Sequence, residues 1–167
     1  MTRAKPADIA DFLRSIGLDV RTADLSHEEC FLPGIRLHRG AVLYDEAALA
    51  WPGDLLHEAG HVAVAPPETR SLFTGAADVP GLDMRRLEHA AVAWSYAAAL
   101  VMGIDPAAVF HEGGYRGRSD GILTTFAAGV YPGANLLEEA GMTATGPRAA
   151  ALGVAPYPHM IEWLRPK

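Results

Sequence analysis

Residues 51–67 read WPGDLLHEAGHVAVAPP, and this pattern predicts a short buried helix. Proline and glycine precede Asp54, the expected N-cap, and two prolines follow Ala65, so the helix should span about 54–64. Within it the side chains are apolar or small except for those of His57, Glu58 and His61. Polar groups on so apolar a helix need buried partners, because burial removes their hydrogen bonds to water.

His57 and His61 lie four residues apart, so their imidazoles project from the same face of the helix. Two neutral imidazoles in this arrangement can each reach one Zn²⁺ at about 2 Å. Glu58 can take a proton from a metal-activated water, as the general base of a metallohydrolase does. Two alternatives remain open. The histidines could be core residues bonded separately to backbone carbonyl groups, or the pattern could have arisen by chance in a metal-free helical domain.

A catalytic zinc site needs a third protein ligand and one open position. Glu88 is the strongest candidate, near the start of a helix predicted over 84–102 and capped by Asp83. Beyond its first turn this helix is apolar or small on nearly every side, which is typical of a buried helix. A carboxylate there costs roughly several kcal/mol unless it is paired or coordinated. The alternatives are an ion pair with Arg85 or exposure to solvent. Weaker ligand candidates are His89, Asp78, Asp83, His111 and Glu112.

The composition indicates a globular protein of one domain, residues 1–167, with half of its residues apolar and a fifth charged. A net charge of −6 and the lack of a Lys/Arg-rich stripe argue against a nucleic-acid partner. No run approaches the ~18 uninterrupted apolar residues of a membrane span, so we expect no membrane partner. The single cysteine, Cys30, excludes an internal disulfide and fits a reducing cytoplasm.

Hydrophobic periodicity predicts an α+β fold that is mostly helical. Besides the two helices above, shorter ones are expected at 6–16, from 105, and over 119–129, 133–141 and 157–165. Segments 35–38 and 41–44 flank Arg39-Gly40 and predict a β-hairpin or a bulged strand pair. The expected architecture is therefore a helical domain with a small antiparallel sheet beside the His-Glu-x-x-His helix.

Three segments between about residues 35 and 103 occur in an order that is typical of one kind of metal site. They are a strand that ends in Leu43-Tyr44-Asp45, the HEAGH motif at 57–61, and Glu88-His89-Ala90-Ala91 with Trp94 on a later apolar helix. This order resembles the ImmA/IrrE-type zinc metallopeptidases, which are zincins of the gluzincin kind. In that family the two motif histidines and the later glutamate bind zinc, and the motif glutamate is the catalytic base. The resemblance implies a zincin-like fold, a zinc ion on His57, His61 and Glu88, and Glu58 as base.

Amide hydrolysis also needs a hydrogen-bond donor for the oxyanion that develops on the carbonyl oxygen. Residues 111–118, HEGGYRGR, join two predicted helices and concentrate such donors, and a solvated loop is the alternative interpretation. The candidate substrate or oxyanion residues are His111, Tyr115 and Arg116. Strand 41–44 could offer an edge to which an extended peptide adds by main-chain hydrogen bonds.

The leading hypothesis is therefore a cytoplasmic zinc metallopeptidase that acts on a peptide or protein substrate. The alternative is a binding or regulatory module that keeps the zincin scaffold without turnover. Glu58 favours the enzyme, because a structural zinc site fills its fourth position with protein and needs no base. The sequence carries no signal for the identity of the substrate or for an oligomeric state.

Overall fold

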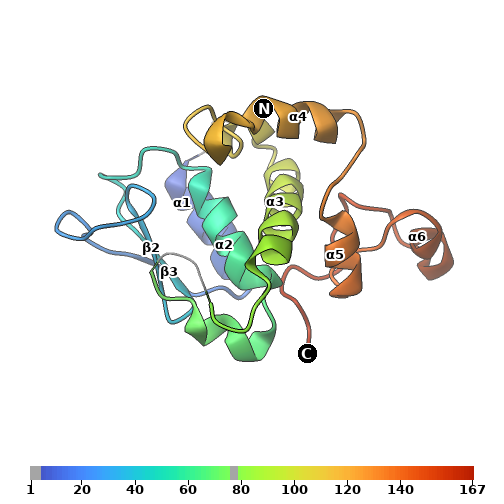
Figure 1. The fold of residues 1–167 in the computed structure, drawn as a ribbon, viewed down its shortest axis with the longest axis horizontal. Helices are drawn as coiled ribbons and strands as arrows, with labels where there is room; N and C mark the ends of the chain where they lie inside the picture. Colours follow the sequence, from blue (N-terminus) through green and yellow to red (C-terminus); the bar gives the residue numbers. More distant parts are fainter. Residues whose placement is uncertain (1–4, 76–78) are drawn as a thin grey trace.

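The structure is a computed structural model that describes residues 5–75 and 79–167. Figure 1 shows the helix α2 at the centre, with a small sheet on one side and the helix α3 on the other. In chain order the elements are α1 (Pro6–Ser15), β1 (Val20–Thr22), β2 (Ile35–His38), β3 (Ala41–Tyr44), α2 (Asp54–Val64), η1 (Pro67–Leu72), α3 (Met84–Val101), η2 (Pro106–Ala108), η3 (Tyr115–Gly117), α4 (Ser119–Ala127), α5 (Ala134–Glu139) and α6 (Gly146–Leu152). This is an α+β protein, as predicted.

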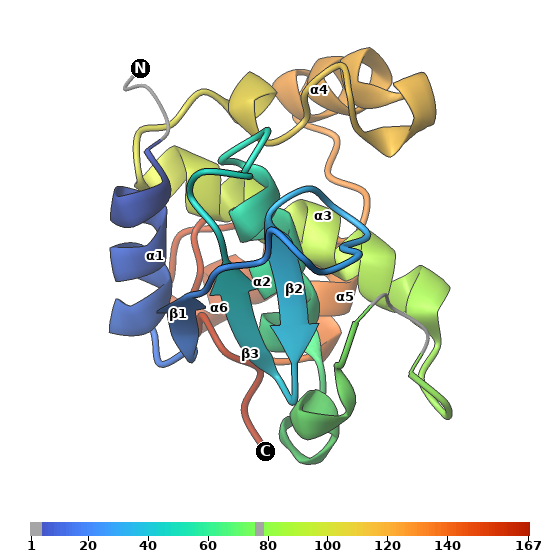
Figure 2. The same ribbon diagram turned by 90° about the vertical axis from the view of Figure 1, so that its left-hand side faces the viewer.

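The sheet is mixed, in the order β1-β3-β2. β2 and β3 form the predicted antiparallel hairpin, and its two-residue turn has positive φ at both Arg39 (50°) and Gly40 (81°), as a type I′ turn requires. The prediction of a purely antiparallel sheet is wrong, because β1 joins β3 in parallel. The expectation that strand 41–44 offers an edge is also wrong: β3 is the central strand, and β2 lies at the edge in front of α2 (Figure 2).

The two long helices form almost where the sequence places them. α3 begins as expected, because the Asp83 carboxylate accepts a hydrogen bond from the Arg86 N–H group at 3.1 Å. α2 begins differently: Gly53 is its N-cap, and Asp54 lies in the first turn with its side chain bound elsewhere. A Cβ atom at Gly53 would lie 2.0 Å from the Ala108 carbonyl oxygen, so only glycine allows this approach to η2.

The C-terminal region departs most from the predicted elements. No helix forms over 157–165, because this segment makes extended contacts instead: Thr143 and Met160 form a β-bridge, and Ile161 N–H donates to the Met142 carbonyl at 2.9 Å. The helix α6 was not predicted. The segments expected from 105, over 119–129 and over 133–141 correspond to η2, α4 and α5, with slightly shorter bounds.

The core is a single cluster of buried apolar residues that extends from α1 to Met160. α2 packs directly on α3 at Gly60, where an added Cβ atom would lie 3.2 Å from the Ala91 carbonyl oxygen and 3.3 Å from Ser95 Oγ. The fully buried Trp94 supports this contact and donates a hydrogen bond from Nε1 to the Trp163 carbonyl. In the part of the chain that the structure describes, no helix is both long and apolar enough to cross a membrane.

Candidate metal centre and groove

Three predicted ligands from two helices converge on one point. α2 supplies His57 and His61 from successive turns, and α3 supplies Glu88 from its second turn. The two Nε2 atoms lie 3.1 Å apart, and the Glu88 carboxylate oxygens lie 3.2 Å from His61 Nε2 and 3.6 Å from His57 Nε2. The structure therefore brings together the three residues that the sequence selected.

The spacing of these atoms fits a tetrahedral zinc ion. Three ligands at ~2.0–2.1 Å from zinc at tetrahedral angles are separated by about 3.3 Å. His61 Nε2 lies close to both other groups. A ring nitrogen carries either one hydrogen or one lone pair, so without a metal ion both contacts would have to share a single hydrogen.

Burial and charge set the protonation of the three groups. Burial, together with the nearby His61, lowers the pKa of His57 to about 4, so this imidazole is neutral and able to bind a metal at neutral pH. Burial opposes charge on both His61 and Glu88, but their mutual hydrogen bond and charges outweigh it. The pKa of His61 is therefore raised and that of Glu88 is lowered. Without a metal ion, the site therefore favours a proton on His61, at the place where a metal cation would bind.

Two of the alternative interpretations, histidines bonded to backbone carbonyls and a Glu88–Arg85 ion pair, are not found among the described residues. Neither His57 nor His61 bonds to a backbone carbonyl, since both buried Nδ1 atoms lack a hydrogen-bond partner among the described residues. This departs from common zinc sites, in which the second ring nitrogen donates to an oxygen. Glu88 does not pair with Arg85; its ion-pair contacts are the two histidines, and its side chain is 44% exposed on the open side of the site.

Glu58 lies beside the three ligands without joining them. It lines the same groove, and burial raises the pKa of its carboxyl group, with His61 partly opposing that shift. A carboxylate of raised pKa is a better proton acceptor than an exposed one. Glu58 is therefore the candidate proton acceptor of this site.

Tyr115 is the candidate donor that the structure places at the site. Its ring contacts the His57 ring edge to face at 5.3 Å, and its buried hydroxyl has no hydrogen-bond partner among the described residues. Burial, and then the charges of Glu88, Asp54 and Glu58, raise its pKa, so the hydroxyl remains a donor. Tyr115 also has a φ of 54°, a conformation that a non-glycine residue rarely adopts and that is typical of functional sites.

His111 holds the segment that carries Tyr115 against α2 and does not line the groove. It is 6% exposed, its Nε2 lies 2.8 Å from Asp54 Oδ1, and its ring stacks on Trp51 at 4.2 Å. Ser119 Oγ donates to the His111 carbonyl at 2.5 Å. The contact with His111 explains why Asp54 does not cap α2, and no local pattern in the sequence indicates it. Arg116, the third predicted donor, is exposed at the rim of the groove.

A groove of about 1510 Å³ passes over the three ligands. One wall is the loop at 28–32 and the edge strand β2, and the other is formed by α3, the 114–118 segment and α4. Of the weaker candidates, His89 lines this groove outside the ligand cluster, Asp83 caps α3, and Glu112 is exposed. Asp78 lies outside the described residues.

Two main-chain groups of the edge strand have no hydrogen-bond partner among residues 5–75 and 79–167. Pairing in the hairpin turns the amide and carbonyl groups of Ile35 and Leu37 away from β3. Ile35 N–H donates to the Leu32 carbonyl, and the Leu37 carbonyl accepts from Gly75 N–H at 2.8 Å. Within the described residues this leaves the Ile35 carbonyl and the Leu37 N–H without partners, one on each side of Arg36.

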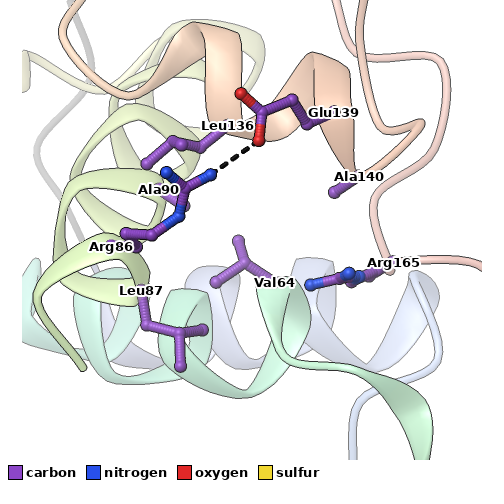
Figure 3. A pocket seen from close by; sticks show the side chains of 8 residues that line it. All are labelled: Val64, Arg86, Leu87, Ala90, Leu136, Glu139, Ala140 and Arg165. Carbon is purple, nitrogen blue, oxygen red and sulfur yellow. Dashed lines mark hydrogen bonds and ion pairs between the residues drawn. The ribbon is translucent and has the colours of Figure 1, made fainter. Parts of the chain in front are cut away.

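A second, smaller cavity of about 260 Å³ lies between α3, α5, the end of α2 and the C-terminal segment (Figure 3). Its floor is apolar, and Arg86 on its edge forms an ion pair with Glu139 at 2.6 Å. No predicted metal ligand lines it.

The chain matches no family model, no curated protein and no solved structure.

Proposed function

We propose that this protein is a zinc metallopeptidase of the cytoplasm, built on a zincin-like scaffold. The observation that carries the proposal is the convergence of His57, His61 and Glu88 at separations of 3.1 to 3.6 Å, with Glu58 beside them in an open groove. A site of three protein ligands with one open side is the arrangement of catalytic rather than structural zinc.

The chemistry divides among the residues of this site. A zinc ion held there would supply a Lewis acid and make a water molecule more acidic. Glu58 accepts the proton of the attacking water and returns it to the leaving amine. The Tyr115 hydroxyl donates a hydrogen bond to the oxygen on which negative charge develops. Its raised pKa keeps that hydroxyl protonated, and the His111–Asp54 contact holds its loop in place.

The groove favours an extended peptide as substrate. The Ile35 carbonyl and the Leu37 N–H can bind both main-chain groups of one peptide residue opposite Arg36, which adds a strand to the edge of the sheet. Such main-chain bonds recognise a peptide of any sequence. They also fix its scissile bond relative to the ligands on α2.

The test compares zinc content and peptide hydrolysis in the wild type and in Glu58→Gln. The variant should bind zinc with the same stoichiometry and lose activity roughly 10²- to 10⁴-fold, because only the proton acceptor is removed. Glu68→Gln, which changes an exposed glutamate of η1, should retain both properties.

Each other outcome has a defined meaning. Equal hydrolysis by Glu58→Gln removes Glu58 from the mechanism. A wild type that binds one zinc ion but cleaves no peptide of a random library supports the binding or regulatory module instead. A wild type without affinity for zinc contradicts the metal centre itself.

A further inference from the structure

We infer that the groove contains an apolar subsite next to the metal centre, formed by Val92 of α3 and by one face of α4, which selects a large apolar side chain beside the scissile bond. This inference rests on the proposed function, because it names the class of peptide that the same site would take. The subsite lies in a part of the chain to which the sequence assigned no role.

Val92 places the subsite close to the ligands. It follows Glu88 by four residues on α3, so the two side chains share one face of the helix and lie about 6 Å apart along its axis. Both line the groove, and Val92 is 9% exposed. A peptide bound across the ligands therefore meets an apolar surface one helical turn away from Glu88.

α4 closes this part of the groove with a single face. The residues of α4 that line it are Gly121, Ile122, Thr125 and Phe126, a spacing that puts all four on one side of a helix. Ile122 is half-buried, whereas Phe126 is buried and packs on Tyr96 at 4.7 Å. Figures 1 and 2 show α4 above α3, and residues of both helices line the groove.

The chemistry of these walls favours an apolar side chain over a charged one. Ile122 is the partly exposed apolar side chain of these walls, whereas Val92 and Phe126 are 9% and 2% exposed and add only small areas of carbon. The nearest charges along the chain belong to exposed residues, Asp120 in the first turn of α4 and Arg116 and Arg118 at the rim, where water screens them. A leucine or phenylalanine side chain of the substrate would lose contact with water here, whereas a carboxylate would lose hydration without a buried partner.

Gly121 gives direct access to the space inside the subsite. It lies in the first turns of α4, and a Cβ atom built on it meets no other atom within 4 Å. A larger side chain at this position would therefore extend into the groove rather than into the core. Gly121→Leu should fill the subsite, and helix formation should tolerate the change because leucine is the better helix former.

The experiment measures binding without turnover. Zinc-loaded Glu58→Gln protein is titrated calorimetrically with three otherwise identical peptides that carry leucine, alanine or aspartate beside the scissile bond, placed in turn on each side of it. The leucine peptide should bind about tenfold or more tightly than the other two at one of the two positions. Adding Gly121→Leu should bring the leucine-to-alanine ratio close to one.

A matched variant separates the subsite from general effects on α4. Ala127→Leu adds the same side chain on the opposite, exposed face of α4 and should leave the ratio unchanged. Thermal melts of both variants establish that they are folded. Equal affinity for the three peptides, tighter binding of the aspartate peptide, or no measurable binding overturns the subsite. An unchanged leucine-to-alanine affinity ratio in Gly121→Leu also overturns it. Hydrolysis by the wild type is measured separately, so failure of the proposed function is seen independently.

Discussion

Two charged residues on opposite faces of α3 have different kinds of partner. Glu88 faces α2, where it meets two buried histidines, and Arg86 faces α5, where it meets Glu139. The two positions are only two residues apart on one helix, so they differ by about 200° around its axis. One face borders the groove of about 1510 Å³, and the other borders the small cavity shown in Figure 3.

The difference lies in whether the protein itself satisfies these groups. Arg86 and Glu139 form a complete ion pair, and both side chains are more than half exposed. On the other face, three potential ligand atoms from two helices converge on one point. Under the proposed function, a metal ion bound there would satisfy all three groups together. A satisfied surface pair indicates only local structure.

Loss of a ligand should have the largest effect. Glu88→Ala should weaken zinc binding by more than the roughly ten- to hundredfold that loss of an outer partner usually causes, because it removes a direct ligand. Competition with a chromogenic chelator measures the affinity. Glu139→Ala removes a carboxylate from the opposite face and should leave zinc affinity unchanged. Equal affinity in Glu88→Ala and the wild type would show that the three groups do not share an ion.

The contact between α2 and α3 should have an intermediate effect. An added methyl group at Gly60 lies only 3.2 Å from the Ala91 carbonyl oxygen, so Gly60→Ala should force the helices apart and destabilise the fold by roughly 1–3 kcal/mol. The same shift would move both histidines relative to Glu88 and weaken zinc binding. Urea denaturation and zinc competition measure the two effects.

Gly121→Ala is the control for Gly60→Ala. A Cβ atom there meets nothing within 4 Å, so the alanine should gain up to about 1 kcal/mol from its helix propensity. If Gly60→Ala proves as stable as Gly121→Ala, the helices are not in the close contact described above.

Local signals in the sequence were sufficient to select the three residues that the structure brings together. Proline and glycine mark the ends of α2, and the spacing of His57 and His61 fixes their common face. A carboxylate at the start of an otherwise apolar helix identified Glu88. Each of these inferences depends on residues within a few turns of one another. Only the meeting of α2 with α3 required the tertiary structure.

The groove could not be predicted in the same way, because its parts meet only in the folded chain. Asp54 was expected to cap α2, but it binds His111, which is 57 positions later. β1 is three residues long and shows no alternation of its own; its pairing with β3 defines it. In the sequence, Ile122 and Phe126 form an ordinary apolar stripe on a helix. Only the structure shows that they line the same groove as Val92.

Arg86→Ala should have the smallest effect, and it tests whether the two faces of α3 are independent of each other. Arg86→Ala removes an exposed ion pair, so the free energy of unfolding should change by no more than about 0.5–1 kcal/mol. High salt should reduce even that difference, because it screens exposed charges. Zinc affinity should stay at the wild-type value, although the mutation lies two residues from Glu88. Denaturation at low and high salt, combined with zinc competition, checks all three expectations. A marked loss of zinc affinity would mean that the Arg86–Glu139 pair positions the start of α3, and that the two faces are mechanically coupled.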